Sequence, residues 1–230
     1  MAIGDGLIDP INEWDYGPLM YQLGLIDERQ LSYVNLQTAL ARFQIESQNY
    51  TAAYMLFGYI IGEYYTNVTG LQNIYNYLLA QEPEELGYYV PWVTAEDSRR
   101  RLHVGNLTYN NGEKVEQALI NDIMQSIVDK VVVIANNYKV MIYNGLLDII
   151  IGEPLTQSWI NKFEFQYTDE LRKAERHIWK VDPNDEEVAG YVKRAHDFYY
   201  ATVRNAGHMV PHDQPRATFD LIDRFVNDNF

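Results

Sequence analysis

The sequence predicts an α/β fold in which parallel strands alternate with helices and a helical cap is inserted between strands. Two compact apolar runs, residues 138–145 and 199–203, are typical of buried parallel strands. An amphipathic helix follows the second run at the end of the chain. Between residues 11 and 110 the pattern is instead mainly helical, which indicates a cap rather than part of the sheet.

The first half of the chain contains one short strand and a long helical region. "MAIGDG" reads as the end of a buried strand, residues 1–3, that runs into a glycine turn. Residues 17 to about 82 carry apolar side chains three and four positions apart, which predicts helices. A loop and a short helix should follow, and "RLHVG", residues 101–105, is predicted to be a short extended element.

The second half returns to alternating elements. Residues 113–135 are predicted to be helical, and 138–145 form a strand that ends in Asn-Gly. A polar, helix-rich insertion should then extend to about Gly190, before the strand at 199–203. The last helix places Pro215 in its first turn, where proline fits best. Its buried face is predicted from the spacing of Phe219, Ile222, Phe225 and Val226.

Composition excludes several classes of function. The 230 residues are enough for one sizeable domain. Their formal net charge of −14 repels phosphate backbones, so no nucleic-acid partner is expected. The chain has no cysteine, which excludes disulfides, thiolate metal sites and a cysteine nucleophile.

Targeting and metal-binding signals are also missing from the sequence. The longest apolar runs, such as "VVVIA" at 131–135, are too short to span a membrane, and the first ten residues contain no recognisable signal peptide. His103, His177 and His196 show no metal-ligand spacing with one another, so neither a metal nor a cofactor is predicted.

Two polar motifs follow the two predicted late strands. Asp148 comes three residues after Gly145, and His208 lies in a glycine- and proline-bounded loop, "NAGHMVPHDQP". Reacting groups of open parallel sheets gather at the carboxyl ends of the strands. A histidine there can take a proton from a nucleophile, while a carboxylate fixes its tautomer and stabilises the imidazolium. The order Asp then His is that of the α/β-hydrolases. The neighbouring His212 and Asp213 are predicted to shape the loop.

Four stretches resemble signatures of the serine carboxypeptidases: "AIGDGLIDP", "LHVG", "IYNGLLD" and "AGHMVPHDQP". The region around His208 resembles the vitellogenic-carboxypeptidase-like branch most closely. The resemblance covers essentially the whole chain and implies the C-terminal half of the family's α/β-hydrolase fold. It implies core residues 1–10 and 111–230, with the helical cap at 11–110.

The resemblance also implies roles for individual residues. Asp148 would be the acid and His208 the base of a catalytic triad, and Met209 would line the pocket for the departing C-terminal residue. Substrates would be peptide or protein C-termini. Asn67 and Asn106 lie in N-x-T sequons and would be glycosylated, because the family is secreted or lysosomal.

The nucleophile of that triad is absent from the sequence. An α/β-hydrolase serine needs a glycine two residues away on either side. None of the five serines has one; they are Ser32, Ser47, Ser98, Ser126 and Ser158. In the family the nucleophile and the oxyanion hole precede "AIGDGLIDP", so both are expected upstream of residue 1.

Three readings of function remain open. The chain is the C-terminal half of a serine carboxypeptidase, a truncated relative that only binds partners, or an acyltransferase on the same fold. On its own, this chain is not expected to hydrolyse peptides. The absent central strands would leave apolar edges open, so a marginally stable or homo-oligomeric protein is expected unless an N-terminal half joins it.

Overall fold

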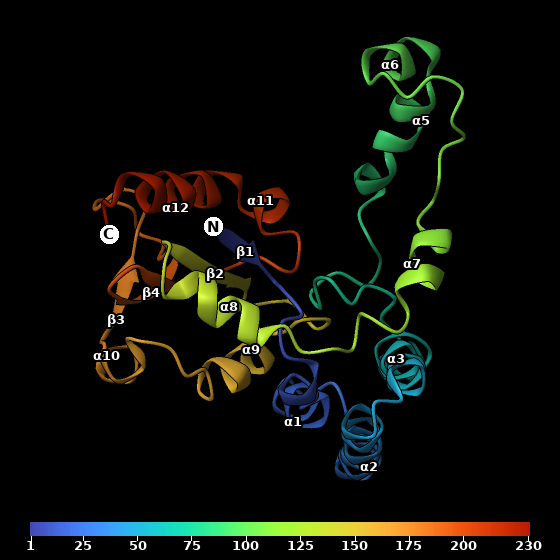
Figure 1. Cartoon of the computed structure of the whole chain (residues 1–230), viewed down its shortest axis with the longest axis horizontal. Helices are drawn as coiled ribbons and strands as arrows, with labels where there is room; N and C mark the ends of the chain where they lie inside the picture. The colour runs from blue at the N-terminus through green and yellow to red at the C-terminus, as the bar shows by residue number, and fades with distance from the viewer.

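A five-stranded mixed sheet forms the centre of the computed structural model, which describes all residues 1–230 (Figure 1). The strand order is β1-β2-β5-β4-β3. The strands are β1 (Ala2–Gly4), β2 (Val140–Gly145), β3 (Arg176–Trp179), β4 (Gly190–Ala195) and β5 (Phe198–Val203). β1, β2 and β5 are parallel, whereas β4 and β3 run antiparallel to their neighbours. The parallel alignment brings the carboxyl ends of β1, β2 and β5 to one edge.

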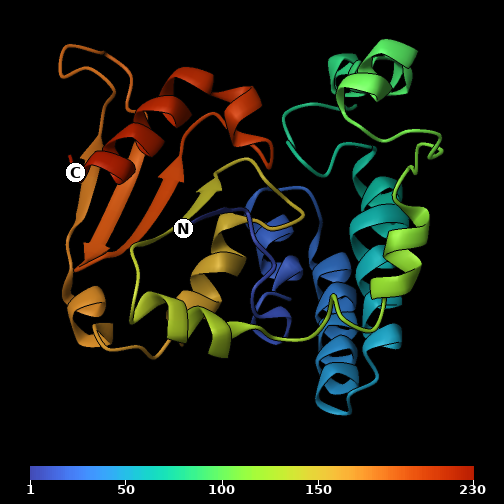
Figure 2. The same cartoon turned by 45° about the horizontal axis from the view of Figure 1, so that its top comes forward.

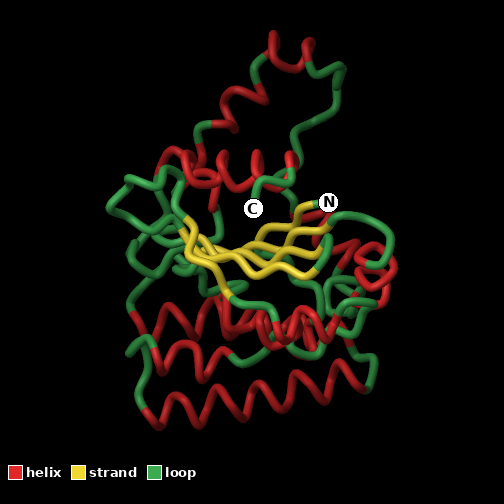
Figure 3. The backbone as a smooth tube through the Cα atoms, turned by 90° about the vertical axis from the view of Figure 1, so that its left-hand side faces the viewer, coloured by secondary structure: helices red, strands yellow, loops and turns green.

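Helices cover both faces of this sheet (Figure 3). One face packs against α11 (Val210–Asp213) and α12 (Pro215–Asn227). The other face packs against α8 (Val128–Ala135), α9 (Glu153–Ile160) and α10 (Thr168–Lys173). All six side chains of β5 are buried, which matches the continuous apolar run expected of a strand covered on both faces.

The helical part of the chain has a core of its own beside the sheet (Figure 2). Trp14, Tyr16, Phe57 and Tyr65 are among its buried side chains. Its elements are η1 (Pro10–Asn12), α1 (Tyr16–Gln22), α2 (Glu28–Glu46), α3 (Tyr50–Gly58), the π-helix η2 (Tyr59–Tyr64) and α4 (Tyr65–Thr69). No helix of the chain has the length and apolar character needed to cross a membrane.

An arm projects away from both cores (Figure 1). It contains η3 (Glu84–Gly87), α5 (Tyr89–Thr94) and α6 (Glu96–Arg101), and it leads back through α7 (Glu113–Leu119). No residue of η3, α5 or α7 is buried. Aromatic side chains such as Tyr88 and Trp92 are more than half exposed on this arm.

Several predicted boundaries in the first half are wrong. The helices end at Thr69 rather than near residue 82, because Gly70 adopts a left-handed conformation with φ of 74°. Residues 101–105 are not extended: α6 ends at Arg101, and His103 lies in a turn with φ of 57°. The predicted helix at 113–135 is divided into α7 and α8 by a turn.

Two predictions in the second half are also wrong. The polar insertion before Gly190 contains strand β3, and β4 begins at Gly190 itself. The predicted buried face of α12 is correct at Phe225 and at Ile222, which packs against the core, but Phe219 is 76% and Val226 63% exposed. The other buried residues of this helix are Ala217, Thr218 and Leu221. The buried residues 217, 218, 221 and 225 follow the helical spacing of three and four residues, and this stripe leaves Phe219 and Val226 on the outer side.

Candidate active site

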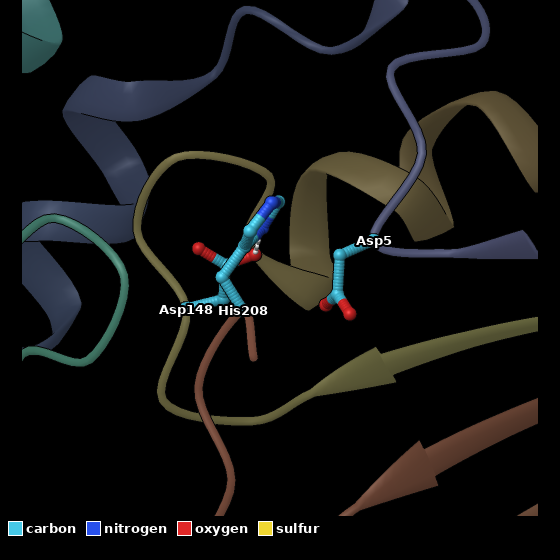
Figure 4. Close-up of side chains that lie close together, drawn as sticks. All are labelled: Asp5, Asp148 and His208. Carbon is cyan, nitrogen blue, oxygen red and sulfur yellow. Dashed lines mark hydrogen bonds and ion pairs between the residues drawn. The ribbon is translucent and has the colours of Figure 1, made fainter. Parts of the chain in front are cut away.

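Asp148 and His208 meet at the carboxyl ends of β2 and β5 (Figure 4). Nδ1 of His208 lies 2.8 Å from Oδ2 of Asp148. The Asp148 side chain is fully buried, while a quarter of the His208 side chain is exposed. This hydrogen bond is the only one that the imidazole makes within the chain, so Nε2 has no partner.

The lack of a side chain at Gly145 lets the two loops that carry these residues touch. A Cβ atom on Gly145 would lie 2.0 Å from the carbonyl oxygen of Gly207, which is far inside van der Waals contact. The close approach lets the N–H of Leu147 donate to the carbonyl of Ala206 at 2.8 Å. Backbone contact between the loops therefore sets the distance from Asp148 to His208.

A segment of the helical part, residues 73–77, also reaches the site. The backbone N–H of His208 donates to the carbonyl oxygen of Tyr75 at 2.7 Å. The Tyr75 ring lies against the imidazole, with centroids 5.4 Å apart. The N–H of Ile149 donates to the carbonyl of Ile74 at 3.1 Å, so this segment contacts both the loop of Asp148 and the loop of His208. Residues 73–77 lie outside any helix, although the sequence pattern predicted helices up to about residue 82.

Asp213 ties the His208 loop to the same segment. Its Oδ2 accepts hydrogen bonds from the N–H of Gly207 at 2.8 Å and from Nδ2 of Asn76 at 2.9 Å. Its Oδ1 lies 2.9 Å from Nδ1 of His212. The loop-shaping role predicted for this pair of residues thus has a specific structural basis at Asp213.

A second buried carboxyl group, Asp5, lies beside the pair at the end of β1 (Figure 4). Its Oδ1 accepts hydrogen bonds from the N–H of Gly145 at 3.0 Å and from Nδ2 of Asn144 at 3.3 Å. Asp5, Asp148 and His208 place one polar atom each within 4.8 Å of one another. Asp5 was not among the predicted site residues, although its place directly after a parallel strand was the available signal.

Burial dominates the electrostatics of the two acids. It raises the pKa of Asp5 to about 9, and the negative charge of Asp148 adds to that rise. Burial also raises the pKa of Asp148, while the hydrogen bond with His208 opposes the rise. No lysine or arginine forms an ion pair with either acid, and His208 pairs with Asp148 alone.

The three side chains are of types that bind metal ions, but their arrangement fits a different chemistry. Nδ1 of His208 and Oδ2 of Asp148 are in direct hydrogen-bond contact, which leaves no space for an ion between them. A buried carboxylate bonded to a histidine whose other nitrogen is free can orient that histidine as a base.

The other residues singled out by the sequence are spread over the surface. Met209 adjoins His208 and is 43% exposed. Asn67 is exposed on α4, and Asn106 is exposed in the loop after α6. The largest surface cavity, of about 710 Å³, is lined by residues of β3, β4 and the C-terminal end of the chain, including Trp179 and Phe230, and by none of the three clustered side chains.

Comparisons with known proteins agree on one family. The family model described as "Serine carboxypeptidase" matches residues 1–228. The chain is 40% identical to the probable serine carboxypeptidase CPVL of Homo sapiens, covering 98% of this chain and 49% of that protein. It is 35% identical to the vitellogenic carboxypeptidase of Aedes aegypti, covering 100% and 50%.

A solved structure shows the same fold. The prohormone-processing carboxypeptidase Kex1(delta)p from Saccharomyces cerevisiae is similar with a TM-score of 0.76 and 21% identity, over 99% of this chain and 54% of that one. The predicted α/β fold is confirmed by this likeness. This chain spans about half the length of the curated relatives it matches. From the match over residues 1–228 and the identity to these relatives, the chain belongs to the serine carboxypeptidase family.

Proposed function

We propose that this chain supplies the acid and the base of a serine carboxypeptidase active site, which removes C-terminal residues from peptides. The observation that carries the proposal is the 2.8 Å contact between Nδ1 of His208 and the buried Oδ2 of Asp148. Membership of the family supplies the reaction class.

In this mechanism Nδ1 of His208 donates its hydrogen to Asp148, which leaves Nε2 free to take a proton from a serine hydroxyl. The serine then attacks the peptide carbonyl, and His208 gives the proton to the departing amino acid. Asp148 stabilises the imidazolium formed between these steps. Water releases the acyl group from the serine by the same proton transfers.

The nucleophile has to come from outside these 230 residues. None of the five serines has the glycine spacing of a nucleophile elbow, and no serine hydroxyl is hydrogen-bonded to His208. The chain alone therefore lacks the attacking group, and we expect it to be inactive toward peptides.

The remaining assignments follow from family membership and from exposure. Met209 would line the pocket for the departing residue, and its partly exposed side chain beside His208 is accessible for that contact. Asn67 and Asn106 would carry glycans in a secreted or lysosomal protein, since both are exposed. Residues 11–110 would form the cap, and residues 1–10 and 111–230 the core.

The test compares the native protein with the isolated chain. An antibody against the His208 loop recovers the native protein, whose mass, reaction with a fluorophosphonate serine probe and release of C-terminal amino acids from blocked dipeptides are measured. We expect a mass well above 26.8 kDa, probe labelling and amino acid release. The isolated chain should show neither labelling nor release.

A non-catalytic binding protein is the second candidate. Exposed aromatic side chains on the projecting arm, such as Tyr88, Tyr89 and Trp92, favour it because clustered exposed aromatic residues are typical of interaction surfaces. A native mass near 26.8 kDa without probe labelling would support this candidate against the enzyme.

A further inference from the structure

Asp5 is a buried acid to which neither the sequence motifs nor the triad mechanism gives a role. It is 6% exposed at the carboxyl end of β1, and its backbone has φ of 47°. Aspartate and asparagine tolerate this left-handed conformation better than most residues do. The conformation directs the side chain toward the ends of β2 and β5 rather than to solvent (Figure 4).

The two oxygens of Asp5 have different surroundings. Oδ1 accepts hydrogen bonds from the backbone of Gly145 and the side chain of Asn144. Oδ2 accepts none from the chain. Asp5 also lies within 4.8 Å of polar atoms of Asp148 and His208, so a second acid and an imidazole are its close titratable neighbours.

The surrounding groups disfavour the ionisation of both acids at once. The titratable groups that face Asp5 are Asp148, His208, Tyr143 on β2 and Tyr200 on β5. Tyr16 and Tyr75 face Asp148 from the helical part. None of these is a permanent cation. Two carboxyl groups that share a buried site without a cation retain one proton between them.

We propose that Asp5 is a positioning residue of the site: its carboxyl group stays protonated and donates its hydrogen to Asp148, so that the two acids carry one negative charge beside His208. Asp148 is then held from two sides, by the imidazole and by Asp5. The pair of acids then presents a single negative charge that orients His208, and the pair does not take up a second proton. This proposal builds on the proposed role of Asp148 and His208, but its test does not depend on peptide cleavage.

The variant Asp5→Asn tests whether Asp5 is protonated or ionised in the wild-type chain. The amide oxygen can accept the same two hydrogen bonds, its NH₂ group can donate to Asp148, and asparagine tolerates the backbone angle. The imidazole signals of the 230-residue chain are followed by NMR from pH 5 to 10, and the His208 signal is identified by its loss in His208→Gln. If Asp5 is protonated, Asp5→Asn should move the His208 titration midpoint by less than about 0.3 pH units, because the charge is unchanged.

The wild-type signal should also show a second inflection near pH 9, where Asp5 loses its proton, and Asp5→Asn should abolish it. An ionised Asp5 gives the opposite result. Removing its charge would then lower the His208 midpoint by about one pH unit, since a neighbouring anion favours imidazolium. That shift without an alkaline inflection would overturn the proposal. Asp197→Asn is the matched control, because Asp197 pairs with the exposed His196 at 3.3 Å and should move only that histidine.

Infrared spectroscopy gives a second measurement that needs no histidine assignment. The wild-type chain at neutral pH should show the stretching band of a protonated carboxyl group, and the Asp5→Asn difference spectrum should show its loss. Absence of that difference would contradict the proposal even if both variants fold. Failure of the native protein to cleave peptides would leave both spectroscopic results intact, so the two proposals fail separately.

Discussion

The carbonyl oxygen of Tyr75, in the helical part of the chain, accepts the backbone N–H of His208 at 2.7 Å. The candidate base is therefore held by two elements: Asp148 orients its ring, and Tyr75 anchors its backbone. Elements 130 residues apart in sequence must pack correctly before the imidazole has a fixed position.

Replacing Asp148 with asparagine should change the tautomer of His208. The amide can present an N–H to Nδ1, which places the imidazole hydrogen on Nε2 and removes the free base. In the native protein, turnover should fall on the order of 10⁴-fold with little change in fold. Nitrogen NMR of His208 reports the tautomer, and an unchanged tautomer with full activity would refute the assignment.

Replacing Gly207 with alanine should destabilise the protein. The new Cβ would lie 2.0 Å from the carbonyl oxygen of Tyr75, so the backbone contact that anchors His208 would have to open. We expect a loss of about 1–3 kcal/mol in the free energy of unfolding, measured by urea denaturation. Gly58→Ala is the control, because a Cβ there meets nothing within 4 Å and lies in a helix. Equal stability of the two variants would contradict the prediction.

Replacing Asp213 with alanine should loosen the His208 loop. The change removes the acceptor of two hydrogen bonds, from Gly207 and from Asn76, in a side chain that is 12% exposed. We expect a destabilisation of about 2–3 kcal/mol and faster amide hydrogen exchange at Gly207 and His208. Asp223→Ala, at an exposed position of α12, should leave this exchange unchanged.

The stability of the chain should fall as pH rises through the neutral range. Burial raises the pKa of Asp5 to about 9 and that of Glu13 to about 8, so the folded state holds these protons where the unfolded state has released them. Each group therefore favours folding at low pH. The contribution of each group to the free energy of unfolding declines as the pH rises from its unfolded pKa, near 4, to its folded pKa. The slope of this decline is up to about 1.4 kcal/mol per pH unit.

Neutral substitutions should flatten that pH dependence. Oε2 of Glu13 accepts the N–H groups of Ile8 and Asp9, and the amide oxygen of Glu13→Gln can accept both. Glu13→Gln and Asp5→Asn should each reduce the stability lost between pH 5 and pH 8 in urea titrations. Glu170→Gln, on an exposed position, should not. A wild-type stability that rises over this range would mean that both carboxyl groups ionise in the folded protein.

The sequence predicted those elements of the fold that have a recognisable local residue pattern. β2 and β5 are continuous apolar runs because helices cover both faces of the sheet, and Pro215 marks the start of α12. β3 and β4 were missed because they contain charged residues, such as Arg176 and Lys193, and depend on pairing across the edge of the sheet. Their strand conformation is fixed by distant partners rather than by local pattern.

The same distinction applies to the site. Asp148 and His208 each follow a recognisable strand, so their types and positions could be chosen from the sequence. Asp5 also follows a predicted strand and could have been chosen in the same way, whereas Tyr75 could not, because its partner His208 lies more than 130 residues further along the chain. Phe219 and Val226 were placed in the core because the spacing alone does not say which side of an amphipathic helix faces the sheet.

The contacts of residues 73–77 limit how such a protein can change over time. A segment that bonds to both loops of the site cannot be exchanged between relatives as an independent module, because any replacement must present the same carbonyl groups at the same places. The helices before it are free to vary wherever they touch only each other. Diversification of the helical part is therefore expected to concentrate in the exposed arm and to spare residues 73–77, which bond to both loops of the site.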